Sequence, residues 1–326
     1  MASLPMGGSA WNRLKEAADR ELEGANIASP DSDHDVNTLA VALVYARTGD
    51  AHYRQKAAEA IRSAMGTEYT GRRNGPGSPQ GALAVSIGRN LVSYVIAADL
   101  IELGAYDAQL EMEFRVWIDG LRYEEWEDGS LVYIDEVRAD HDGRIAGASR
   151  AAVAAYLGDE SELARAAQVF KGFLGDRDAY SGFRFGNDMS WQADSSLPVG
   201  INPMGASRGE SFIGGALPEE MQRGCPLRIS PCPTSAPWLS LQGIVAEAMI
   251  LYRQGYDVWN WEDQAILRAV QFLYDLHVTY PEAGWWAKGD DRWVVWLINS
   301  VYGTDFPVQA ARIGKNMGWT DWTHAP

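Results

Sequence analysis

The stretch AVALVYARTGDAHYRQKAAEAI, residues 40–61, shares its pattern with two later segments. These are ASRAAVAAYLGDESELARAAQVF, residues 148–170, and AEAMILYRQGYDVWNWEDQAILRAVQFL, residues 246–273. In each, an Ala-rich helical pattern leads into Tyr, a Gly-Asp or Gly-Tyr-Asp turn, and a second amphipathic helical pattern. Gly favours the left-handed position that ends a helix, and the Asp after it is expected to cap the next helix. Each segment therefore predicts an antiparallel hairpin of two helices.

Further helical patterns lie between and after these hairpins. Residues 84–103 and 107–123 predict two helices that pack against each other, and residues 293–302 predict a short apolar helix. The sequence therefore predicts an all-α fold. We expect residues 1–326 to form one domain, in which hairpins stack around a ring as an incomplete (α/α) toroid. A straight solenoid is the alternative, but its repeat would be shorter and more regular.

Two irregular segments interrupt the helical patterns. Residues 69–80 are rich in Gly and Pro, and residues 180–237 are dense in Gly, Pro, Trp and Asn. Loops of such length inside a compact domain are usually functional, so both are expected at the mouth of the toroid, where they would form a cleft. The closing GKNMGWTDWTH, residues 314–324, is interpreted as a packed tail rather than a sugar-binding platform.

The composition is strongly acidic. The net charge is −16 and the pI is near 4.7, which argues against nucleic acid as the main partner. Of the 28 basic residues, 5 are lysines and 23 are arginines, a bias that suits recognition of carboxylates or reflects a GC-rich genome. Apolar runs are too short for a membrane span, and the first residues, MASLPMGGSA, do not resemble a signal peptide.

The two cysteines flank a short Pro-rich loop, CPLRISPC, from Cys225 to Cys232. A disulfide would suit an oxidising compartment, and two buried thiols fit the sequence as well. No second Cys pair or His cluster at ligand spacing accompanies them, so no metal site is expected.

Several of these motifs resemble a known family. GALPEEMQRG, residues 215–224, followed by WLSLQGIVAEAMILYRQGYDVWNW, residues 238–261, resembles the C-terminal half of the alginate-lyase superfamily. IGRNLVSYVIAADLIEL, residues 87–103, and AGASRAAVAAYLGD, residues 146–159, are similar to its N-terminal helices, so the likeness covers residues 40–276. The resemblance implies an (α/α)-toroid polysaccharide lyase that cleaves an anionic, uronic-acid-containing glycan by β-elimination. It implies no cofactor, and such a substrate favours a secreted or periplasmic location.

The resemblance also indicates site residues. The family has an Asn-His pair before its central helix, and here His141 stands at the His position with Asp140 in place of Asn. Arg223 matches the catalytic Arg of the family's Pro-Glu-x-x-Arg stretch, although pairing with Glu219 or Glu220 across one helical turn is its structural alternative. The family's catalytic Tyr falls near Ile229, so this chain departs from the pattern there.

β-Elimination requires a base for the proton next to the uronate carboxylate and an acid for the leaving oxygen. It also requires a group that stabilises charge on the carboxylate. We expect His141 to act as the base and Arg223 to stabilise the charge. Because Ile229 exchanges no proton, Tyr133 or Tyr180 is expected to donate to the leaving oxygen, with its pKa lowered by a nearby Arg.

Four further residues are assigned to substrate binding. Arg89 and Asn90 lie near the start of an apolar helix and are expected to project into the mouth, with hydrogen bonding at the helix start as the alternative. Trp191 lies in the long loop and is expected to stack on a sugar face, although most tryptophans simply pack. Asp140 completes this set.

Two other functions remain open. A glycoside hydrolase on the same scaffold needs two carboxyl groups across the scissile bond. A non-catalytic glycan-binding protein would have kept the fold and lost the Tyr. Candidate carboxyl groups for the hydrolase are Asp140, Asp142, Asp188, Glu219 and Glu220.

Overall fold

The computed structural model describes residues 3–69, 83–310 and 314–325, and this part of the chain is mostly helical, as predicted. The longer helices are α1 (Gly8–Asp19), α2 (His34–Thr48), α3 (Ala51–Ala64), α4 (Leu83–Leu100), α6 (Ala108–Tyr123), α8 (His141–Leu157), α9 (Glu160–Leu174), α11 (Ala236–Arg253), α12 (Trp261–Thr279) and α13 (Trp293–Tyr302). The short elements are α5 (Leu103–Tyr106), α7 (Leu131–Val137), α10 (Pro218–Met221), α14 (Thr320–Thr323), the hairpin strands β1 (Ser207–Arg208) and β2 (Ser211–Phe212), and the 3-10 turns η1 (Thr67–Tyr69), η3 (Val258–Asn260), η4 (Pro281–Ala283) and η5 (Gly289–Asp291).

The first two Gly-Asp turns form as predicted. Gly49 ends α2 with φ 72°, and the side chain of Asp50 accepts a backbone N–H from the first turn of α3 at 2.9 Å. Gly158 ends α8 with φ 70°, and Asp159 accepts a backbone N–H from the first turn of α9 at 3.2 Å. Both pairs of helices pack against each other. A Cβ at either Gly would be strained in this left-handed conformation.

The third turn differs from the prediction. Gly255 is left-handed, with φ 93°, but Asp257 begins only the 3-10 turn η3 and its side chain makes no capping bond. Helix α12 then packs against η3 and α9. The extra Tyr256 between Gly and Asp shifts the carboxylate away from the N–H groups that it would cap, so the capping prediction is wrong here.

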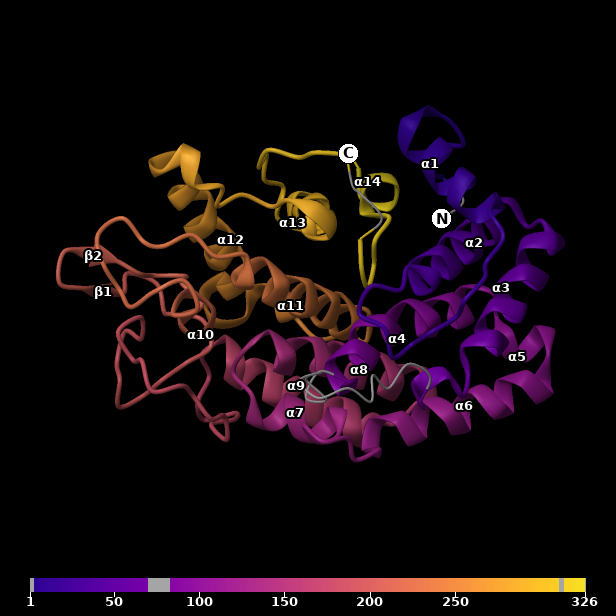
Figure 1. Ribbon diagram of the computed structural model, residues 1–326, viewed down its shortest axis with the longest axis horizontal. Coiled ribbons are helices and arrows are strands. Elements are labelled where there is room, and N and C mark those ends of the chain that lie inside the picture. The colour runs from indigo at the N-terminus through magenta and orange to yellow at the C-terminus, as the bar shows by residue number, and fades with distance from the viewer. Residues whose placement is uncertain (1–2, 70–82, 311–313, 326) are drawn as a thin grey trace, which may run out of the picture.

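Four helices form a continuous series through the molecule. Helix α2 packs on α4, α4 on α8, and α8 on α11 (Figure 1). Helix α4 is long and apolar enough to cross a membrane, but 67% of it is buried inside the molecule, as expected of a core helix. Helix α6 packs on α5, α7 and α8 rather than mainly on α4, which corrects the predicted pairing of residues 84–103 with 107–123.

The four core helices run in the same direction. The last turns of α4, α8 and α11 line one cavity together with Leu39 and Leu43 of α2. Their C-terminal ends, including those that carry Gly49, Gly158 and Gly255, therefore gather at one end of the molecule. His141, the first residue of α8, lies toward the opposite end.

Helices α8 and α11 approach each other closely because each carries a glycine, Gly147 or Gly243, that faces the other helix. A Cβ on Gly243 would lie 2.5 Å from the carbonyl carbon of Arg144. A Cβ on Gly147 would lie 2.5 Å from an Asp135 oxygen and 2.7 Å from a Glu247 oxygen. Here the buried Arg144 pairs with Asp135 at 3.1 Å and with Glu247 at 3.5 Å, which links α7, α8 and α11.

The C-terminal segment packs against α2 and α4. Lys315, in the segment that leads to α14, is buried and donates to Asp35 at 3.0 Å and to Asn90 at 2.7 Å. Trp319 donates its indole N–H to the carbonyl of Val36 at 2.8 Å. The interpretation of residues 314–324 as a packed tail is confirmed.

The predicted long loop is also present. Between α9 and α11 the described chain contains only β1, β2 and α10 as regular elements. The other irregular segment, residues 69–80, lies outside the described residues except for Tyr69.

Candidate functional site

The candidate site forms where α8 begins. Asp140 is the N-cap residue of α8 and His141 is its first residue. The preceding strand-like segment pairs with the long loop, because Arg184 donates its backbone N–H to the carbonyl of Val137 at 2.7 Å. The sequence RADHDGR thus places polar side chains where a core helix starts and the long loop passes.

Glu220 connects this helix start to the Pro-Glu-x-x-Arg stretch. It lies on the short helix α10 and its side chain is buried. It accepts the backbone N–H of His141, and its two carboxylate oxygens lie 3.2 and 3.1 Å from Nδ1 of the same residue. One carboxylate therefore holds both the start of α8 and the imidazole of His141.

Arg223 joins the same group. Its Nη2 lies 3.0 Å from Oδ2 of Asp140, and its Nε lies 3.2 Å from Oε2 of Glu220. The predicted partners His141 and Arg223 are thus brought together through Glu220 and Asp140. The alternative contact of Arg223 with Glu220, one helical turn away, is also present.

Two more charges complete what we call the His141 cluster. Arg138 lies 2.6 Å from Asp140 and 2.8 Å from Asp142, and Asp142 lies 3.3 Å from Nε2 of His141. The cluster is partly open, since the side chain of His141 is 15% exposed and that of Arg223 is 42% exposed. It consists of Arg138, Asp140, His141, Asp142, Glu220 and Arg223.

Neighbouring charges fix the protonation of the cluster. Burial acts to lower the pKa of His141, but the hydrogen bond and charge of Glu220 outweigh it, so the pKa is raised. Burial acts to raise the pKa of Asp140, but Arg138, His141 and Arg223 outweigh it and the pKa is lowered. Asp140 is therefore a carboxylate at neutral pH, whereas His141 tends to hold a proton.

Glu219 provides a contrasting carboxyl group beside the cluster. Its oxygens accept the backbone N–H of Gly186 at 3.1 Å, and Gln222 donates to Oε2 at 2.6 Å. No cation contacts it directly in the described structure. Burial, and then the charges of Asp140 and Glu220, raise the pKa of Glu219 to about 7, so it can give or take a proton near neutral pH.

Two exposed arginines lie near residues of the cluster, Arg184 in space and Arg228 in the sequence. Arg184 lies beside Arg138 in the paired segments, and Arg228 lies five residues beyond Arg223; both are exposed. Within the described chain, neither guanidinium has a carboxylate or hydrogen-bond partner. In so acidic a protein, such arginines are suited to an anionic ligand.

The two candidate tyrosines have different outcomes. Tyr133 is 44% exposed, and its hydroxyl has no hydrogen-bond partner among the described residues. Tyr180 donates its hydroxyl to the backbone carbonyl of Glu136, and burial raises its pKa although Arg165 acts in the opposite direction. The prediction of a Tyr180 activated by a nearby Arg is wrong, because the hydroxyl is used in packing α7 against the loop.

Two predictions of substrate contact are also wrong, in both cases because the side chain is buried. Asn90 is fully buried and donates to the carbonyls of Ile27 at 2.9 Å and Ser29 at 2.8 Å. Trp191 is 1% exposed, and its indole N–H donates to the carbonyl of Cys225 at 2.8 Å, so neither ring face is open to a sugar.

Arg89 is paired rather than free, since its guanidinium contacts the carboxylate of Asp290. Its side chain retains 17% exposure, and Asp290 precedes α13. Arg89 therefore lies apart from the contacts of the His141 cluster.

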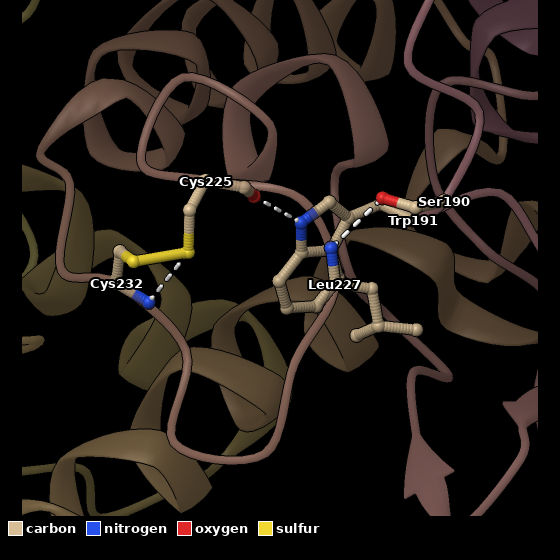
Figure 2. The surroundings of a disulfide bond; sticks show 5 residues. All are labelled: Ser190, Trp191, Cys225, Leu227 and Cys232. Atoms are coloured by element: carbon tan, nitrogen blue, oxygen red, sulfur yellow. Dashed lines mark hydrogen bonds between the residues drawn. A yellow bond between two sulfur atoms is a disulfide. The ribbon is translucent and has the colours of Figure 1, made fainter.

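The cysteines form a disulfide that shapes the loop after Arg223. Cys225 and Cys232 are bonded, and Leu227 donates its backbone N–H to the Ser190 hydroxyl at 2.8 Å (Figure 2). At the far side of this loop, Ile229 is 70% exposed. Ile229 is thus exposed to solvent on a loop that the disulfide closes.

Sequence reasoning missed part of the site. Glu220 was considered only as a partner of Arg223 or as a hydrolase carboxylate, and Arg138 was not singled out. The spacing of Arg138 and Asp142, four residues apart, was the available signal for their pairing. Nothing in the sequence indicates that Glu220 binds the start of a helix 79 residues earlier.

Among the residues described, no group of three or more His, Cys, Asp and Glu side chains is arranged to hold a metal ion. Comparison with models of protein families, with curated proteins and with solved structures finds no match for this chain.

Proposed function

We propose that this protein is a polysaccharide lyase that cleaves a uronic-acid-containing glycan by β-elimination at the His141 cluster. The observation that carries the proposal is that His141 and Arg223 both contact the carboxylate of Glu220, and that Arg223 also contacts Asp140, the residue before His141. The sequence predicts complementary roles for these two residues at one uronate, and they lie 82 positions apart in the chain.

The proposed scaffold is an incomplete (α/α) toroid formed by residues 1–326 as one domain. The series α2, α4, α8 and α11 supports it, because these helices run in one direction and two of them are followed by a packed return helix. In such an arrangement the long loop from α9 to α11 lies at the end where α8 begins, beside His141.

In the proposed reaction, His141 in its neutral form removes the proton from the carbon next to the uronate carboxylate. The electron pair forms a carbon–carbon double bond as the bond to the 4-linked oxygen breaks, and that oxygen receives a proton from an acid. Arg223 stabilises the charge that moves onto the carboxylate, with Arg184 and Arg228 available to bind neighbouring uronates. Of the two tyrosines, Tyr133 remains the proposed donor because its hydroxyl is free.

Asp140 is the main departure from the family pattern, because a carboxylate replaces a neutral amide. Its charge is balanced by Arg138 and Arg223, so it serves in this proposal to orient Arg223 rather than to touch the uronate carboxylate. The disulfide and the polymeric substrate together support a secreted or periplasmic location.

One observation favours a glycoside hydrolase as the second candidate. The pKa of Glu219 is raised to about 7, whereas the pKa of nearby Asp140 is lowered. Neighbouring carboxyl groups with pKa values pushed apart are the pattern of a general acid and its partner.

The two candidates give different products from the same incubation. The protein is incubated with alginate, glucuronan and glycosaminoglycans, and the products are followed by ultraviolet absorbance and by reducing ends. A lyase forms new ends that absorb as unsaturated uronates, and a hydrolase forms reducing ends without that absorbance. Replacing His141 by Gln is expected to lower the lyase rate by about 10²–10⁴-fold. His52→Gln, at an exposed position on α3, is the matched control and should leave the rate unchanged.

A further inference from the structure

A cavity lies far from the His141 cluster. It has a volume of about 410 Å³ and is bounded by the last turns of core helices. Its lining residue Tyr156 is fifteen residues beyond His141 on α8, which corresponds to about 22 Å along a helix. The volume falls within the range of about 300–1,000 Å³ that small-molecule sites occupy. Nothing in the proposed lyase reaction uses this cavity.

The inner part of the cavity is apolar. Leu39 and Leu43 of α2, Val95 of α4, Ala152 of α8 and Met249 of α11 line it, so each of the four core helices contributes. An apolar group placed here loses contact with water on several sides, which favours binding by about 25 cal/mol per Å². The cavity is therefore suited to a ligand with a hydrocarbon body.

The polar residues that line the cavity include Arg253 of α11, Asp99 of α4 and His324 near the C-terminus. Arg253 is the one Lys or Arg among the lining residues; it is exposed, and its guanidinium has no ion pair or hydrogen bond within the described chain. Burial, and then the charge of Arg253, lower the pKa of His324 to about 4, so this imidazole is neutral at pH 7. The positive charge in the cavity is thus that of Arg253 alone.

We propose that this cavity binds a small monocarboxylic acid with an apolar body, its carboxylate on Arg253 and its hydrocarbon part among Leu43, Val95 and Met249. A guanidinium binds a carboxylate through two parallel hydrogen bonds, which Arg253 offers with no competing partner. The negative charge of Asp99 at the same cavity disfavours a ligand with a second carboxylate.

Octanoate is the probe that tests this assignment, by isothermal titration calorimetry on the full chain at pH 7. Octylamine has the same body with the opposite charge, and suberate, the eight-carbon diacid, must place a second carboxylate on apolar residues. We expect octanoate to bind at least about tenfold more tightly than either. Arg253→Gln should weaken octanoate by about tenfold or more, the loss typical of a hydrogen bond to a charged group. Arg62→Gln, on the exposed face of α3, should have no effect.

Two further variants separate this cavity from the arginines of the His141 cluster. Ala155→Leu places a larger side chain at the cavity wall and should weaken octanoate binding, whereas Arg223→Gln, which removes an arginine of the His141 cluster, should not. Circular dichroism confirms that each variant is folded. In the wild type, methyl NMR should show octanoate shifting the signals of Met249 and Met317, which both line the cavity. Absence of binding at millimolar octanoate, undiminished binding by folded Arg253→Gln, or tighter binding of octylamine would each overturn the proposal.

Discussion

Replacing Glu220 by Gln is expected to lower the pKa of His141 by about one unit. The two carboxylate oxygens lie 3.2 and 3.1 Å from Nδ1 of His141, and this hydrogen bond is the main cause that raises the imidazole pKa. An opposite charge at such range shifts a pKa by about 1–3 units. Burial raises the pKa of Glu220 itself and acts to lower that of His141, so we take the lower end of that range. One unit corresponds to about 1.4 kcal/mol.

The sign of the effect on stability follows from the raised pKa. Folding increases proton binding at His141, so its contribution to the free energy of unfolding is fully present below the ordinary pKa of 6.5 and is lost as pH rises through the folded pKa. In Glu220→Gln this loss should be smaller. If His141 is the base, the lyase rate of the wild type should rise over the same pH range, since the neutral imidazole accumulates there.

The assay is an NMR titration of the imidazole signals, which does not depend on activity. The chain has five His residues, and the spectrum of His141→Gln identifies the signal concerned. Asp142→Asn is the matched control: Asp142 lies 3.3 Å from Nε2 but contributes less than Glu220, so its removal should lower the pKa by less. A His141 pKa that is unchanged in Glu220→Gln, or falls more in Asp142→Asn, would refute the reasoning.

Three other variants test the account. Burial, and then the charge of Asp135, raise the pKa of Glu247 well above its ordinary value although Arg144 acts in the opposite direction, so folding favours the protonated form; Glu247→Gln should keep stability at neutral pH and reduce the loss of stability as pH rises above about 4.5, measured by urea unfolding. Cys232→Ser opens the loop pinned to Cys225 and should lower the free energy of unfolding by about 2–3 kcal/mol in non-reducing buffer, with no difference when wild type and variant are both reduced. Tyr180→Phe should keep the lyase rate, because its hydroxyl bonds only a backbone carbonyl; a loss of about a hundredfold would restore Tyr180 as the proton donor.

Local patterns predicted the helices and two of the turns well. At Gly49-Asp50 and Gly158-Asp159, the left-handed Gly and the capping Asp interact only with residues a few positions away. The local sequence is therefore enough to predict these two turns. Asp257 differs because one inserted residue moves the carboxylate relative to the next helix.

Burial was less predictable. Asn90 and Trp191 looked accessible from their neighbours in sequence, but residues distant in the chain cover them. Asn90 is buried by its contacts with the segment before α2 and with the C-terminal Lys315, and Trp191 by the disulfide loop. These contacts depend on how the terminal segments and the disulfide loop pack against the helices, and a local sequence pattern does not indicate that packing.

The family resemblance predicts that His141 and Arg223 lie in one site. Only the structure shows that Glu220 contacts both of them. Whether these residues act as one catalytic unit is tested by the lyase rates of His141→Gln, Arg223→Gln and the double variant on the polyuronate that the wild type cleaves best. If both act on the same transition state, the double variant should be no slower than the slower single variant, because groups that act together are not additive. Losses that multiply, full activity in either single variant, or a wild type that forms no unsaturated uronate from any of these polymers would contradict the account.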